Sequence, residues 1–77
     1  MERQEKFDEA IRYVTEVIRI NPGYAPAYNE TGIILAQKGK LQKSREFFLK
    51  AIQLEPDYKK ARNNLLVLEH MLNQDEK

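Results

Sequence analysis

The sequence predicts an all-α protein of about four helices, and three observations support this. Apolar residues recur at steps of three and four, which places them on one face of a helix. Prolines and glycines interrupt this pattern at intervals that suit short helices. The chain also repeats itself, because the tetrapeptides NPGY at 21–24 and EPDY at 55–58 lie 34 residues apart and the same shift aligns Ile18 with Ile52. We find no alternating pattern that would predict a β-strand.

The first two helices are delimited by proline and glycine. The first should end before Pro22, because proline cannot continue a helix and disfavours helical backbone in the residue before it. The second should run from about Pro26, which a first turn tolerates, to Lys38, after which Gly39 can adopt the left-handed conformation that ends a helix. The apolar stripe of the first helix consists of Phe7, Ala10, Ile11, Val14, Val17 and Ile18.

The last two helices follow the same plan. The third should end before Pro56, and its buried face is predicted to be Leu41, Ser44, Phe48, Ala51 and Ile52. Asp57 is then available as the N-cap of a fourth helix. The apolar face of that helix is predicted to be Ala61, Leu65, Leu68 and Leu72.

The composition excludes several classes of protein. The 77 residues include 13 basic and 12 acidic side chains, a balance that provides no general attraction for nucleic acid, so no nucleic acid is expected as a partner. The longest run of large apolar residues, 33–35, is far below the roughly 18 that a spanning helix needs, so no membrane insertion is expected. The absence of cysteine excludes disulfides and thiolate metal sites. The N-terminus lacks the apolar core of a signal peptide, which favours a cytoplasmic location.

The sequence offers no catalytic residues, no metal site and no cofactor motif. The single histidine, His70, has no cysteine or second histidine with which to hold a metal ion. The three glycines form neither a dinucleotide fingerprint nor a phosphate-binding loop. We therefore expect a protein that is not an enzyme.

The 34-residue period and the residues within it resemble the tetratricopeptide repeat (TPR). That motif has the form W-x2-L-G-x2-Y, followed by a small residue, an aromatic residue, alanine and proline. The resemblance implies an α-solenoid, in which antiparallel helix-turn-helix hairpins stack as a right-handed superhelix. Glycine and other small residues would then allow the helices of a hairpin to approach closely. The matching structural positions are Tyr28, Gly32, Leu35, Ser44, Phe48, Ala51 and Pro56, with Pro22 ending the preceding unit.

The register divides a single TPR-like domain, residues 1–77, into one complete repeat and two halves. Residues 1–24 match the second helix of a repeat, 25–58 match a whole repeat, and 59–77 match a first helix or a terminal solvating helix. The solvating alternative is favoured by Arg62, Leu66 and Glu69, which stand where an aromatic residue, glycine and leucine stand one period earlier.

The resemblance implies a non-catalytic protein–protein interaction scaffold. In TPR proteins the first helix of each repeat lines a groove that binds a peptide or helix of a partner. Lys60 and Asn64 resemble part of the carboxylate clamp of some members, but Ile33 and Val67 stand where that clamp has asparagine. An apolar or mixed peptide is therefore the better expectation. The groove candidates are Asn29, Ile33, Ala36, Gln37, Lys60, Asn63, Asn64, Val67 and His70.

Two other functions remain open. The first helix lacks the helix that normally precedes it, so either the chain is a fragment of a longer array or another chain covers the open face. Homo-oligomerisation, as a dimer or a helix swap, is compatible with both. The self-association candidates are the stripe residues Phe7, Ala10, Ile11, Val14, Val17 and Ile18. A nucleic-acid-binding helical repeat is less favoured, because the basic clusters at 38–45 and 59–62 are better explained by solubility.

Overall fold

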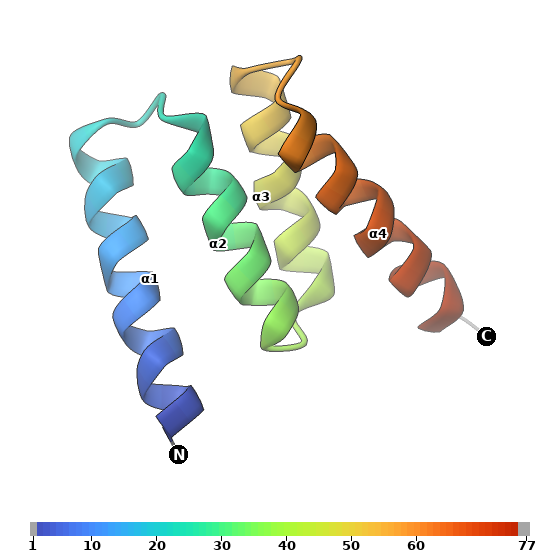
Figure 1. Cartoon of the computed structure of the whole chain (residues 1–77), viewed down its shortest axis with the longest axis horizontal. Helices are drawn as coiled ribbons and strands as arrows, with labels where there is room; N and C mark the ends of the chain where they lie inside the picture. Colours follow the sequence, from blue (N-terminus) through green and yellow to red (C-terminus); the bar gives the residue numbers. More distant parts are fainter. Residues whose placement is uncertain (1, 76–77) are drawn as a thin grey trace.

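The computed structural model describes residues 2–75, and side chains within 6–74, as four α-helices (Figure 1). These are α1 (Glu2–Ile20), α2 (Ala25–Gln37), α3 (Leu41–Leu54) and α4 (Lys59–Asp75). The predicted all-α class is confirmed, and α2 and α3 end where the glycine and the second proline were expected to end them.

The turn between α2 and α3 requires Gly39. Its φ is +84°, a left-handed conformation that a side chain would disfavour. The backbone N–H of Lys40 donates to the carbonyl of Leu35 at 2.9 Å, and that of Gly39 donates to the carbonyl of Ala36 at 3.0 Å. These bonds satisfy carbonyls that the end of α2 would otherwise leave free, and they reverse the chain within three residues.

The turns before α2 and α4 have the same construction, one period apart. In the first, the Tyr28 hydroxyl donates to the carbonyl of Pro22 at 2.8 Å. In the second, the Arg62 guanidinium donates to the carbonyl of Pro56 at 2.6 Å. A side chain in the first turn of the following helix therefore ties each proline turn, although an aromatic residue does this in one case and a cation in the other.

The prediction that Asp57 caps α4 is wrong. The helix begins at Lys59, so Tyr58 occupies the position immediately before it. The equivalent residue before α2, Tyr24, makes no side-chain cap bond. The turn is held by the Arg62 side chain and by a backbone bond in which the N–H of Tyr58 donates to the carbonyl of Glu55 at 3.0 Å.

The closest helix contact lies between α2 and α3. A Cβ atom placed on Gly32 would lie 2.5 Å from Cε1 of Phe48, so only glycine leaves room for that ring. The Ser44 hydroxyl donates to the carbonyl of Gly32 at 2.6 Å. Ser44 and Ala51 have no exposed surface. Small residues thus bring the two backbones together, and one aromatic ring fills the space beside them.

Three alanines connect this hairpin to α4. Ala25, Ala51 and Ala61 form a buried cluster, against which Tyr28, Ile52 and Tyr58 pack. Each alanine comes from a different helix, so the cluster is where α2, α3 and α4 meet.

The helices form a thin array rather than a closed bundle. The principal extents are 39 × 36 × 15 Å. In the part of the chain that the structure describes, α1 packs on α2 alone, whereas α4 packs on both α3 and α2. Figure 1 shows α1 and α4 at opposite ends of the row. One face of each terminal helix is therefore left without a neighbouring helix.

The Gly32–Phe48 contact predicts a large effect of a small change. We expect Gly32→Ala to lower the free energy of unfolding by about 1–3 kcal/mol, because the added methyl overlaps the Phe48 ring. Gly23→Ala is the matched control, since a Cβ there meets nothing within 4 Å, and its effect should stay within about 0.5 kcal/mol. Urea denaturation followed by circular dichroism measures both. Equal losses in the two variants would contradict this packing.

Candidate partner-binding site

A hollow of about 510 Å³ lies between α2 and α4. We call it the α2–α4 hollow. Five of the residues that line it were predicted from the sequence, and three were not. The predicted residues are Asn29, Ile33, Lys60, Asn63 and Asn64, and the others are Pro26, Glu30 and Tyr58.

The remaining four groove candidates do not line this hollow. Ala36 and Gln37 lie in the last turn of α2, where Ala36 is half-buried and Gln37 is exposed. Val67 is 62% exposed on α4. His70 is exposed, with its Nε2 atom 3.1 Å from the side-chain nitrogen of Gln74. The structure thus brings together the candidates nearest the proline turns, and the binding role of all nine stays a prediction.

Asn29 and Asn63 occupy equivalent positions but have different surroundings. Asn29 is only 4% exposed, and its Oδ1 accepts a hydrogen bond from the Asn64 side-chain amide at 3.0 Å. Asn63 is exposed. The difference arises because α4 covers Asn29, while no helix in the described structure covers the same position of α4. Asn29 and Asn64 therefore hold α2 and α4 together and form the floor of the hollow.

Tyr58 stands at one wall of the hollow with an altered acidity. Partial burial of its ring raises the pKa of the hydroxyl above its usual 10.0, and the negative charge of Glu55 raises the same pKa further. The contact with Asn29 acts in the opposite direction, and Glu30 adds to the increase. Glu30 and Lys60 are both exposed at this site, so its rim carries charges of both signs.

All three missed residues had a signal in the repeat. At the 34-residue shift Pro26 aligns with Lys60, Glu30 aligns with Asn64, and Tyr58 aligns with Tyr24. What the alignment could not show is that Tyr58, in the turn after α3, packs beside α2 of the same repeat.

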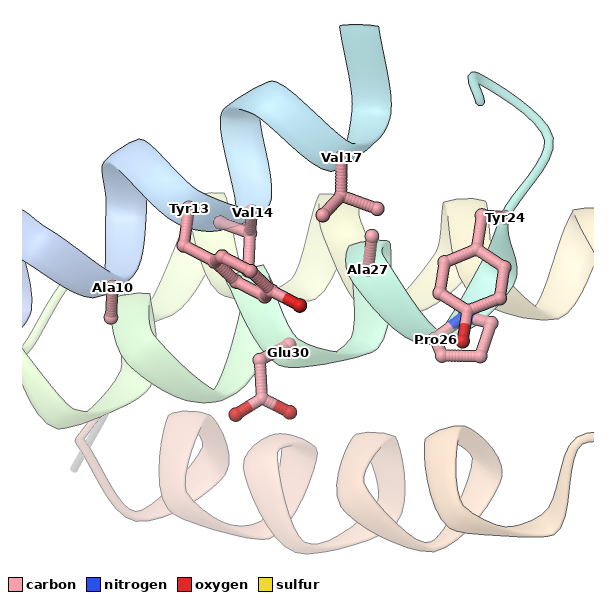
Figure 2. A pocket seen from close by; sticks show the side chains of 8 residues that line it. All are labelled: Ala10, Tyr13, Val14, Val17, Tyr24, Pro26, Ala27 and Glu30. Atoms are coloured by element: carbon pink, nitrogen blue, oxygen red, sulfur yellow. The ribbon is translucent and has the colours of Figure 1, made fainter. Parts of the chain in front are cut away.

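A second hollow, of about 310 Å³, lies between α1 and α2 (Figure 2). We call it the α1–α2 hollow. Three self-association candidates line it, of which Val14 is buried and Ala10 and Val17 are half-buried. The other candidates, Phe7, Ile11 and Ile18, are half-buried and lie outside it. The remaining lining residues are Tyr13, Tyr24, Pro26, Ala27 and Glu30.

The most exposed large apolar side chain of this second hollow was missed. Tyr13 is 71% exposed, and Figure 2 shows its ring beside Val14, at the mouth between the two helices. It was not assigned to the apolar stripe, because its helical position lies at the border of that stripe. Its alignment with Phe47 at the 34-residue shift was the signal that could have identified it.

Two searches of the described residues returned nothing. No group of three or more His, Cys, Asp or Glu side chains in the range searched is arranged to hold a metal ion. Likewise, none of the helices drawn over residues 2–75 has the length and apolarity to cross a membrane.

Comparison with known families identifies the repeat. The model of the family described as "Tetratricopeptide repeat" matches residues 25–58. This segment is a tetratricopeptide repeat. The match begins at the first residue of α2 and ends at the proline turn after α3, so the α2–α3 hairpin is the TPR unit. The predicted resemblance is confirmed, whereas the assignment of residues 1–24 and 59–77 as half repeats stays a prediction.

Curated relatives match most of the chain. It is 38% identical over 66 residues to the human Protein O-mannosyl-transferase TMTC2, which covers 84% of the chain and 8% of that protein. It is 31% identical over 71 residues to the human Protein O-mannosyl-transferase TMTC1, covering 92% of the chain and 8% of that protein. The peroxisomal targeting signal receptor of Saccharomyces cerevisiae is 30% identical over 64 residues, 83% of the chain and 10% of the receptor. No solved structure gives a significant match.

The chain spans a tenth or less of each of these proteins. The matched stretch contains the TPR segment, and the rest of each relative lies outside the match. The transferase activity in two of the names is therefore not transferred to this chain.

The two equivalent asparagines should differ in their effect on stability. We expect Asn29→Ala to lower the free energy of unfolding by about 1–2 kcal/mol, because the half-buried amide of Asn64 loses its hydrogen-bond acceptor. Asn63→Ala, on the exposed side, should change stability by less than about 0.5 kcal/mol. Urea unfolding of the two variants decides this. Similar costs for both would mean that the Asn29–Asn64 bond contributes nothing to holding α4.

The raised pKa of Tyr58 predicts a pH dependence of a stated sign. The folded state holds the Tyr58 hydroxyl proton more tightly than the unfolded state does. The protonated hydroxyl therefore contributes fully to the free energy of unfolding below about pH 10, and this contribution is lost as the pH rises through the folded pKa. The absorbance difference between wild type and Tyr58→Phe, followed near the tyrosinate band, should rise above pH 10. In denaturant the same difference should rise near pH 10, which is the control. Coincident curves would refute the burial of this ring.

Proposed function

We propose that the chain is a non-catalytic protein–protein interaction scaffold that binds an extended peptide or a helix of a partner in the α2–α4 hollow. The observation that carries the proposal is the mixed lining of that hollow on a fixed floor. Ile33 offers apolar surface, and the exposed side chains of Lys60 and Asn63 offer hydrogen-bond donors. Most ligand sites combine apolar contact with a few placed polar groups in this way.

The floor of the hollow is organised before a partner arrives. The Asn29–Asn64 hydrogen bond fixes both amides, and among the described side chains no buried nitrogen or oxygen lacks a partner. Binding therefore requires little rearrangement of this surface, which lowers its entropic cost.

The residues favour an apolar or mixed peptide over a terminal carboxylate. One N–H of the Asn64 amide already donates to Asn29, which leaves a single N–H for a carboxylate. Glu30 contributes a negative charge to the same rim, which opposes an acidic ligand. TPR domains generally bind protein partners, and one relative is by name the receptor of a targeting signal. Both facts support a recognition function without identifying the partner.

A selection experiment tests this proposal. Random peptides displayed on phage are selected on the immobilised chain, and the dissociation constants of the enriched sequences are measured by fluorescence polarisation. We expect Lys60→Ala and Ile33→Ser each to weaken binding about tenfold, the loss of one charged hydrogen bond or one buried apolar contact. Lys43→Ala is the matched control, because this lysine is exposed on α3 outside the hollow.

Two outcomes would overturn the proposal. One is the absence of any enriched peptide that binds the folded chain. The other is a set of peptides that bind the Lys60 and Ile33 variants as tightly as wild type, which would place the recognition surface elsewhere. Circular dichroism of each variant checks that the helices are retained.

A further inference from the structure

The α1–α2 hollow repeats, one period earlier, the surface of α3 that α2 covers. Ala10, Tyr13 and Val14 stand at the positions of Ser44, Phe47 and Phe48. In α3 these positions face the neighbouring helix, and Ser44 and Phe48 are 0% and 2% exposed. In α1, Tyr13 is 71% exposed (Figure 2) and Ala10 is half-buried, whereas Val14 is already buried at 3% exposed. This hollow therefore corresponds to one half of a hairpin interface, and no helix of the described structure covers it.

The opposite end of the array presents the other half. Arg62 and Leu66 of α4 stand at the positions of Tyr28 and Gly32, the α2 residues that face α3. Leu66 is 68% exposed, and Val67 beside it is 62% exposed. A helix with these side chains uncovered does not have the polar outer face of a terminal solvating helix.

The charges that favoured a solvating helix are already used within the chain. Glu69 accepts a hydrogen bond from Nε of Arg45 on α3 at 3.1 Å. Arg62 donates to the carbonyl of Pro56. Both charged side chains therefore have partners within the chain. What remains to be explained on the open face of α4 is its exposed apolar side chains.

We propose that the occupant of the α1–α2 hollow is α4 of a second copy of this chain. In this arrangement α4 of one copy packs on α1 of the next as α2 packs on α3 within each copy. The contact joins two different surfaces, head to tail, and it extends the α-helical array from one molecule to the next.

The sizes of the residues at the contact are complementary. Within the chain, glycine at position 32 faces the large ring of Phe48. Across the proposed contact, Leu66 replaces the glycine and Val14 replaces the phenylalanine, so the large and small partners exchange sides. Valine is smaller than phenylalanine, so the Leu66 side chain would enter the hollow above the buried Val14 and contact Tyr13 and the half-buried Ala10.

The polar residues are complementary as well. Asn63 takes the position of Asn29, and Glu30 of the next copy takes that of Asn64. An amide N–H of Asn63 can then donate to the Glu30 carboxylate, in place of the Asn64–Asn29 bond. Glu30 of α2 lines this hollow (Figure 2).

Arg62 also gains partners on the next copy. It takes the position of Tyr28. The ring centroids of Tyr28 and Phe47 are 6.3 Å apart, and the Lys50 Nζ atom lies 6.0 Å from the centroid of the Tyr28 ring. The corresponding residues of α1 are Tyr13 and Glu16. Across the contact, the Arg62 guanidinium takes the place of the Tyr28 ring. It would lie beside the Tyr13 ring and the Glu16 carboxylate, which take the places of Phe47 and Lys50. Glu16 is paired with Arg19 in the single chain, and its oxygens can accept a further bond.

Because the two surfaces differ, each molecule uses one of each and the assembly need not stop at a dimer. This inference does not rest on the proposed peptide-binding function. The two surfaces share Glu30 and Asn63, but the residues that test the inference, Tyr13 and Leu66, lie outside the α2–α4 hollow, so the two proposals are tested by different variants.

The test uses two single variants and their mixture. Tyr13→Glu blocks the hollow and leaves α4 intact, whereas Leu66→Glu blocks α4 and leaves the hollow intact. Both side chains are exposed, so the helices should be retained, which circular dichroism checks. Leu49→Glu is the matched control, because this leucine is 40% exposed on α3 and belongs to neither surface. Masses are measured by light scattering across a wide range of concentration.

We expect the mass of wild type and of Leu49→Glu to rise with concentration above 9.1 kDa, while each blocked variant alone stays at 9.1 kDa. An equimolar mixture of the two blocked variants should form a complex of twice 9.1 kDa and no larger, because one intact surface of each kind remains. A monomeric wild type would overturn the proposal. So would a dimer that Leu66→Glu leaves unchanged, or a mixture that stays monomeric while both variants are folded.

Discussion

Gly32 and Phe48 are in contact where α2 and α3 approach most closely. This contact fixes the position of α2, on which its contacts with α1 and α4 depend. The missing side chain admits the ring, and the Ser44 hydroxyl ties the two backbones at the same level. With α2 held in this way, one of its faces is covered by α3, a second receives α1, and a third forms the α2–α4 hollow with α4. A displaced α2 would disturb all three at once.

A linear array leaves its unsatisfied surfaces at the two ends. Each helix contacts its neighbours in the row, and the stability of such a stack is the sum of its units and their shared interfaces. Among the described elements α1 contacts α2 alone, and the array is 15 Å thick, so no other helix of residues 2–75 covers the terminal faces. The open apolar side chains Tyr13 and Leu66 are a direct result of this geometry.

Equivalent positions in the two periods have acquired different chemistry. Tyr28 and Arg62 hold the same turn through a hydroxyl and a guanidinium. Asn29 is a buried structural residue, while Asn63 is exposed and available to a partner. Position in the repeat determines the direction in which a side chain points, whereas the neighbouring helix determines what it does there.

The sequence by itself determined the helical class, the 34-residue period, the ends of the helices at glycine and proline, and the TPR segment, because all of these are set by neighbours along the chain. It also placed five of the eight residues of the α2–α4 hollow. It did not show that Tyr58 precedes α4, that Asn29 is buried, or that Tyr13 is the open side chain of α1. Only the tertiary structure decided these, because periodicity defines a face of a helix but not which other helix covers it.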